Sequence, residues 1–199
     1  MTWYADLSTE TMVDSGEHIR AVGWLAANQP FPQGKVPGGF ARKLKKYARN
    51  WGKSIDGLGW PVFAGWHDCE LCQQVGNSAA ASGNFGVPAG GLLYVAPEMI
   101  VHYVETHDYL PPQAFIAALM AAPLPGSRAY DQAIAPFRER HRQKFESMLA
   151  ERYAEAARWA AEQGGDEAAV RKAGRQFFGG YAPEDQAKIR QLMEKLKQH

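Results

Sequence analysis

Residues 92–107 read LLYVAPEMIVHYVETH, and this stretch decides the fold class. Its first four residues are apolar, which predicts a short buried strand. Pro97 and Glu98 then favour a helix start, because proline fits the first helical position and a carboxylate suits the positive end of the helix dipole. Apolar residues recur at helical spacing as far as Thr106, so a strand followed by a helix is expected here.

The sequence before this stretch predicts a mixture of short strands, turns and one clear helix. Residues 18–25 are rich in β-branched and aromatic side chains and predict a strand, while residues 77–91 predict a β-hairpin with a loose turn. Phe40, Leu44, Tyr47 and Trp51 recur at helical spacing and predict an amphipathic helix. We therefore expect an α+β fold that is mainly helical, with a small antiparallel β component in the N-terminal part.

A proline and glycine cluster at residues 123–126 marks a change in composition. Five of the six tryptophans and both cysteines precede it, and long helical patterns follow it. This predicts an α+β core over residues 1–125 and a three-helix C-terminal extension over residues 126–199. We expect the first of these helices to carry one apolar stripe, which consists of Phe137, His141, Phe145, Met148, Leu149, Ala156 and Trp159. Asp166 is expected to cap the second helix, and the Ile189 to Leu196 stripe of the third either packs on the core or forms a dimer.

The only two cysteines of the chain, Cys69 and Cys72, form the main chemical motif. Cys-x-x-Cys spacing in a chain without further cysteines is typical of a metal site or a redox site. Zinc prefers four thiolate and imidazole ligands, so we expect His67, Cys69, Cys72 and His102 to bind a zinc ion. His107 is the alternative ligand, but it lies about 140° around an ideal helix from His102, so both reach one ion only if the helix ends between them.

Other interpretations of this motif stay open. The two cysteines are also explained as buried small hydrophobes, or as a thioredoxin-like redox pair, although the glycine-rich sequence that follows fits the latter poorly. Catalytic zinc would need an open ligand position and a base such as Glu70, Glu98 or Glu105. No His-x-Glu segment precedes the cysteines as in the zinc deaminases, which favours structural zinc.

Composition limits the other classes of function. The net charge of +1 gives no overall field that would attract nucleic acid or anionic lipid. The chain shows no targeting signal and no long apolar run, so we expect a cytoplasmic, bacterial protein. One face of the predicted helix is basic and carries Lys43, Lys45, Lys46 and Arg49. It is best explained as a surface exposed to water, although it would also fit an acidic partner or phosphate.

Several segments together resemble a family of small bacterial proteins that share a domain of unknown function. They are YADLS at 4–8, VGWL at 22–25, PFPQGKVP at 30–37, HDCELC at 67–72, APEMIVHYVETH at 96–107 and YLPP at 109–112. The resemblance spans residues 3–122 and supports reading that part as one unit. It implies no activity.

Three functions are compatible with these observations. The first is a binding or regulatory module with a structural zinc, acting on a protein partner or on a second copy of itself; its motives are the many aromatic residues and the lack of a catalytic set. The second is a metal-dependent hydrolase that uses the same His/Cys cluster. The third, a nucleic-acid-associated protein using the C-terminal helices, is the least favoured because their basic excess is small.

Overall fold

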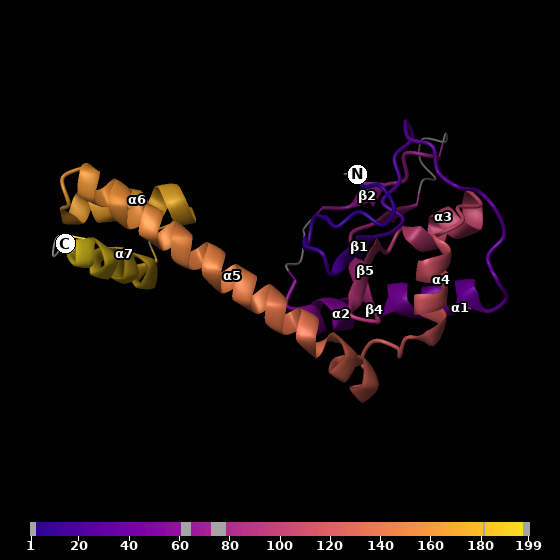
Figure 1. Cartoon of the computed structure of the whole chain (residues 1–199). Helices are drawn as coiled ribbons and strands as arrows, with labels where there is room; N and C mark the ends of the chain where they lie inside the picture. The colour runs from indigo at the N-terminus through magenta and orange to yellow at the C-terminus, as the bar shows by residue number, and fades with distance from the viewer. Residues whose placement is uncertain (1–2, 61–64, 73–78, 181, 197–199) are drawn as a thin grey trace. The chain divides into compact units, whose positions relative to one another are not determined.

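The computed structural model describes residues 3–60, 65–72, 79–180 and 182–196. Over these residues the fold is mainly helical with small β-sheets in the N-terminal half, as the sequence predicted. The elements in chain order are β1 (Ile19–Ala21), α1 (Phe40–Arg49), α2 (Trp51–Leu58), β2 (His67–Asp68), β3 (Ala80–Ala81), β4 (Asn84–Ala89), β5 (Leu92–Pro97), α3 (Ile100–Thr106), α4 (Gln113–Ala121), α5 (Arg128–Glu162), α6 (Glu167–Phe178) and α7 (Pro183–Leu196) (Figure 1).

A three-stranded sheet with the order β1-β5-β4 lies at the centre of the N-terminal unit (Figure 1). β1 is parallel to β5, whereas β4 and β5 form an antiparallel hairpin. Gly90 and Gly91 make its two-residue turn with φ of 56° and 82°, a left-handed geometry that favours glycine. The hairpin therefore lies later in the chain than predicted, and residues 77–78 of the predicted hairpin lie outside the described residues. Strand β5 extends to Pro97, so helix α3 begins at Ile100 rather than near Pro97 as predicted.

Both edges of this sheet are bonded to other parts of the same unit. At the β4 edge, Gly86 donates its N–H to Ser54 Oγ at 2.9 Å and accepts a bond from Tyr130 Oη at 2.8 Å. The two hydroxyl groups also lie 2.7 Å apart, within hydrogen-bonding distance. At the β1 edge, Ala21 donates to Ser8 O at 2.8 Å and accepts from Leu7 N at 2.7 Å. Backbone groups at both edges are thereby satisfied, although none of the described residues adds a fourth strand to this sheet.

Helix α1 confirms the predicted amphipathic pattern, because Phe40, Leu44 and Tyr47 are fully buried. The helix ends earlier than predicted, because Trp51 already belongs to a second helix, α2, which follows Asn50 and was not expected as a separate element. Its short length and two internal glycines weaken the helical signal.

The chain divides into two compact units, residues 1–141 and 142–199. The predicted division lay earlier, after residue 125. The first turns of α5 belong to the N-terminal unit, because Tyr130, Ile134 and Phe137 are buried in its hydrophobic core.

The second unit packs the later part of α5 against α6 and α7, and its core includes Ala156, Val170 and Ile189. Asp166 Oδ1 accepts a bond from the N–H of Ala169 at 2.8 Å, which confirms the predicted helix cap.

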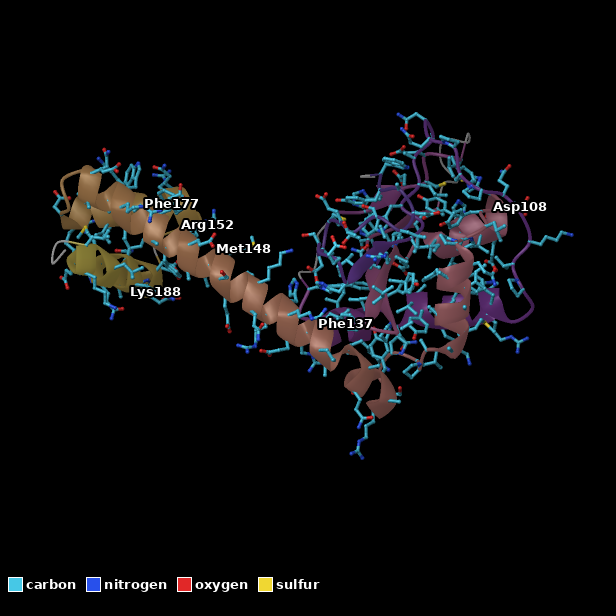
Figure 2. All side chains as sticks on the ribbon, viewed as in Figure 1. Asp108, Phe137, Met148, Arg152, Phe177 and Lys188 are labelled. Carbon is cyan, nitrogen blue, oxygen red and sulfur yellow. The ribbon has the colours of Figure 1, made fainter. Side chains whose placement is uncertain are left out.

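The predicted apolar stripe of the first C-terminal helix is wrong at Phe145 and Met148, which are 59% and 58% exposed. Both precede Tyr153, the first α5 residue buried in the core of this unit. Figure 2 labels Met148 on α5, between Phe137 and Arg152. On α7, Ile189 and Met193 are buried in the same core, so these two residues of the Ile189 to Leu196 stripe serve packing within the unit. Among the described residues, no helix combines the length and apolar character needed to cross a bilayer.

Candidate metal centre

The two cysteines lie on a tight turn that directly follows β2. The short strand β2 pairs antiparallel with β3, and the N–H of Cys69 donates to Ala79 O at 2.8 Å. The N–H of Cys72 then donates to Cys69 O at 3.3 Å, which closes the turn. This local geometry holds the two thiol groups close together.

One of the two histidines lies within α3 and the other directly follows it. His102 is within the helix, which ends at Thr106. His107 has φ of −113° and ψ of 11°, and Asp108 after it is left-handed with φ of 51°. The chain therefore leaves the helix between the two histidines, which meets the condition under which His102 and His107 reach one ion.

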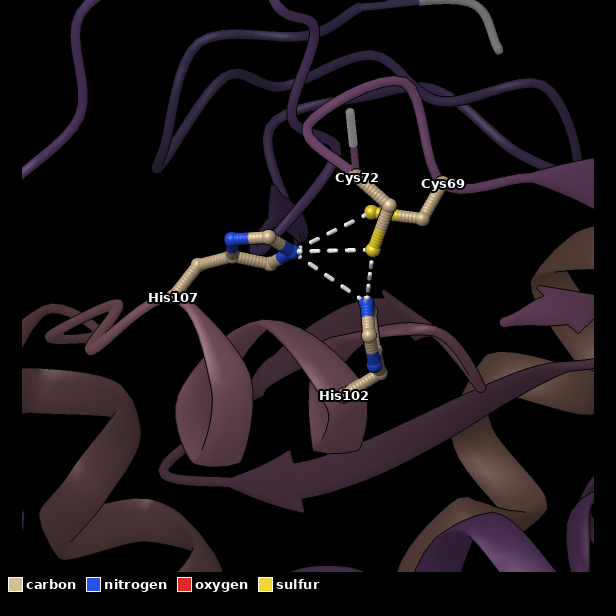
Figure 3. A group of neighbouring side chains, drawn as sticks. All are labelled: Cys69, Cys72, His102 and His107. Atoms are coloured by element: carbon tan, nitrogen blue, oxygen red, sulfur yellow. Dashed lines mark hydrogen bonds between the residues drawn. The ribbon is translucent and has the colours of Figure 1, made fainter. Parts of the chain in front are cut away.

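The four side chains converge on one point (Figure 3). His107 Nε2 lies 3.4 Å from Cys69 Sγ, 3.5 Å from Cys72 Sγ and 3.2 Å from His102 Nε2. Cys72 Sγ lies 3.2 Å from His102 Nε2. All four potential ligand atoms are within 4.8 Å of one another.

Four of the six separations between these ligand atoms are close to the edges of a zinc coordination tetrahedron. With usual zinc bond lengths, an ideal tetrahedron has edges of about 3.5 Å between sulfur and nitrogen and about 3.3 Å between two nitrogens. The sulfur–nitrogen distances of 3.2–3.5 Å and the nitrogen–nitrogen distance of 3.2 Å lie within a few tenths of an ångström of these values. These four separations suit one tetrahedral ion, and the other two are below 4.8 Å.

The second ring nitrogen of His102 also has a suitable partner. His102 Nδ1 lies 3.2 Å from Thr106 Oγ1, one helical turn later. When Nδ1–H donates to this hydroxyl, Nε2 keeps its lone pair free for a metal. Hydrogen bonds of this kind orient metal-binding histidines and fix their tautomer.

Burial shifts the pKa values of one cysteine and one histidine of the cluster. Cys69 is buried, whereas Cys72, His102 and His107 are half-buried. Burial, and secondarily the neighbouring His107, lowers the pKa of His102, which favours the neutral imidazole that binds metals. Burial raises the pKa of the Cys69 thiol, so binding of a metal as thiolate must release a proton.

The predicted site residues are brought together with one exception. Cys69, Cys72, His102 and the alternative ligand His107 form the cluster, whereas His67 is outside it. His67 is paired with Ala81 in the β2–β3 ladder and lines a small hollow beside Met99. β2 ends at Asp68, so the alternation that would place His67 and Cys69 on one face does not continue through Cys69.

A cleft opens beside the cluster, between α1 and α3. His102 and Thr106 line it together with Lys45, Glu98 and Glu105. Lys45 Nζ and Glu105 Oε1 form an ion pair at 2.6 Å. Burial raises the pKa of Glu98, so this carboxylate is a stronger base than an ordinary glutamate.

The fold and the site together define a small α+β domain with a candidate centre of two cysteines and two histidines. Residues 2–120 match the family model described as Domain of unknown function (DUF7919), and the chain belongs to this family. This confirms the resemblance to an uncharacterised family, and all four clustered residues lie within the matched part. Comparisons with curated proteins and with solved structures found no match.

Proposed function

We propose that the N-terminal unit binds one zinc ion through Cys69, Cys72, His102 and His107, and that this zinc stabilises a protein-binding module. The observation that supports the proposal is the approach of all four ligand atoms to within 4.8 Å of one another. Thiolate and imidazole ligands in a tetrahedral arrangement favour zinc over the harder ions magnesium and calcium.

A structural role follows from the number of ligands. Four protein ligands fill a tetrahedral zinc site and leave no position for a reacting water. The ion would join the cysteine turn after β2 to the end of α3, two segments about thirty residues apart in the sequence. Such a link stabilises a region that has little regular structure of its own.

An exposed tryptophan supports the binding part of the proposal. Trp66 lies three residues before Cys69 and is 74% exposed. Tryptophan is enriched in protein interfaces, where it contributes a large contact area. A zinc ion that fixes the adjacent turn would also hold this side chain in place for a protein partner.

Metal analysis of the purified protein tests the proposal. We expect about one equivalent of zinc in the unmodified protein, and clear loss in the Cys69→Ser and His102→Ala variants. Substitution with Co²⁺ should give the absorption bands of a tetrahedral thiolate site. Protein that stays without zinc after purification under reducing conditions and addition of excess zinc would refute it.

A metal-dependent hydrolase is the second candidate, and the cleft beside His102 is the observation that favours it. Glu98 or Glu105 would act there as the general base, and one of the four clustered residues would have to give way to a metal-bound water. X-ray absorption spectroscopy of the zinc-loaded protein separates the two functions. Two sulfur and two nitrogen ligands exclude the hydrolase at this site, whereas a bound water oxygen excludes the closed structural centre.

A further inference from the structure

A second cleft lies away from the cysteine and histidine cluster, between α1 and the end of α4. Three cationic side chains, Arg42, Lys43 and Lys46, line one side of it. Met120 and Leu124 are among the residues that line the other side. The cleft therefore combines positive charge with an apolar surface.

Two of the three cations in this cleft have no acidic partner among the residues that the structure describes. Helix α1 contains five basic residues and no acidic residue. Lys45, on the side facing α3, is paired with Glu105. Neither Arg42 nor Lys46 forms an ion pair with any residue that the structure describes. Arg42 and Lys46 are thus available to an anionic group of another molecule.

The apolar side of the cleft is exposed and held in position. Met120 and Leu124 are 42% and 36% exposed. Lys43 Nζ donates to Met120 O at 2.8 Å, and Tyr47 Oη donates to Pro123 O. These two bonds join the end of α4 and the following segment to α1, so the cleft is formed before any ligand binds.

The pKa of Lys43 reflects repulsion between the cations of this cleft. Burial lowers its pKa, and the nearby positive charge of Lys46 lowers it further. An anion in the cleft would relieve this repulsion, which adds to the attraction exerted by Arg42 and Lys46.

We propose that this cleft binds an acidic peptide segment of a protein partner, with Asp or Glu carboxylates at Arg42 and Lys46 and an apolar side chain on Met120 and Leu124. The inference rests on the binding role proposed above but not on the zinc. A peptide fits better than nucleic acid, because duplex binding needs many phosphate contacts and the chain has a net charge of only +1. The apolar side gives the site a specificity that charge alone lacks.

Two double variants test the proposal with matched changes in charge. Arg42→Gln with Lys46→Gln removes two cations from the cleft, and Lys45→Gln with Arg49→Gln removes two from the neighbouring side of the same helix. The probe is a fluorescein-labelled peptide with the sequence Asp-Leu-Glu-Glu-Leu-Asp, measured by fluorescence anisotropy. We expect the first variant to raise Kd roughly tenfold or more and the second to change it by less than about twofold.

A third variant tests the apolar side. Met120→Gln changes an exposed residue, so we expect the fold to be preserved and binding of the leucine-containing peptide to weaken. The same substitution should leave a peptide with alanine in place of leucine unaffected. This result would support the proposal even if the α1 double variant failed to fold.

Three outcomes would overturn the proposal. They are the absence of measurable peptide binding at low salt, an equal loss in the two double variants, and binding to phosphatidylserine vesicles in preference to the peptide. Zinc content is measured on the same samples. Absence of peptide binding by the unmodified protein when zinc is bound refutes the cleft alone, whereas absence of zinc from the unmodified protein when the peptide still binds refutes the metal centre alone.

Discussion

Replacement of His107 by alanine is the sharpest test of the metal centre. The sequence favoured His67 as a ligand and offered His107 as the alternative, whereas the structure places His107 in the cluster and His67 outside it. His107 Nε2 lies 3.2–3.5 Å from the other three ligand atoms, whereas His67 is not part of the cluster. We therefore expect His107→Ala to weaken zinc binding strongly and His67→Ala to leave it nearly unchanged.

The size of the effect follows from the number of ligands. Structural zinc sites in small domains have apparent binding free energies of about 10–16 kcal/mol, and an equal share for each of four ligands is about 2.5–4 kcal/mol. A loss of this size corresponds to a rise in Kd of roughly 100- to 1,000-fold. An additional water ligand would recover part of it, so the lower end of this range is the firmer expectation.

Competition with a chromophoric zinc chelator measures the two Kd values under reducing conditions. His67→Ala is the matched control, since it removes the same side chain from the same region of the chain. Circular dichroism of both variants with saturating zinc shows whether each is folded. If His67→Ala weakens zinc binding as much as His107→Ala does, the assignment of ligands is wrong.

Three further predictions concern stability, each measured by denaturant unfolding. Ser54→Ala should cost about 1–3 kcal/mol, because the buried N–H of Gly86 loses its acceptor; a cost below about 0.5 kcal/mol would contradict this bond. Burial raises the pKa of Asp6, although bonds from the Gly23 N–H and Tyr109 Oη lower it in part, so its contribution to stability is fully present below the unfolded pKa and is lost as pH rises through the folded pKa. Asp6→Asn should remove that part of the pH dependence, and an unchanged pH profile would contradict it. Asp166→Ala should cost about 1 kcal/mol through the lost cap of α6, and an unchanged midpoint would show that the cap contributes little.

The sequence predicted the local parts of the metal centre but not its complete set. Cys69 and Cys72 are recognisable because a Cys-x-x-Cys turn needs only neighbouring residues. His107 directly follows α3, which ends at Thr106 as the helical pattern predicted, but the choice of His107 over His67 as the fourth ligand depends on how distant segments pack. His67 was predicted as a ligand because it lies two residues before Cys69. Its position is set instead by strand pairing with Ala81, which belongs to another segment of the chain.

The fold shows the same division between local and tertiary information. The α6 cap at Asp166 and the apolar face of α1 follow from local chemistry and were predicted. The exposure of Phe145 and Met148 was not, because helical spacing identifies a face but not the length of it that other helices cover. The core role of Tyr130 in the first unit likewise depends on its distant partner Gly86.

The bonded edges of the β1-β5-β4 sheet affect how this domain meets other proteins. Gly86 already uses both backbone groups on the β4 edge, and Pro88, two residues later, has no N–H to offer. On the opposite edge, both backbone groups of Ala21 are hydrogen-bonded to Leu7 and Ser8. Strand addition, by which many domains capture extended peptides and by which misfolded chains aggregate, is therefore disfavoured at both of these positions. A partner that meets the sheet at these two positions has to be recognised through side chains, and sequence specificity rather than backbone pairing should govern its binding.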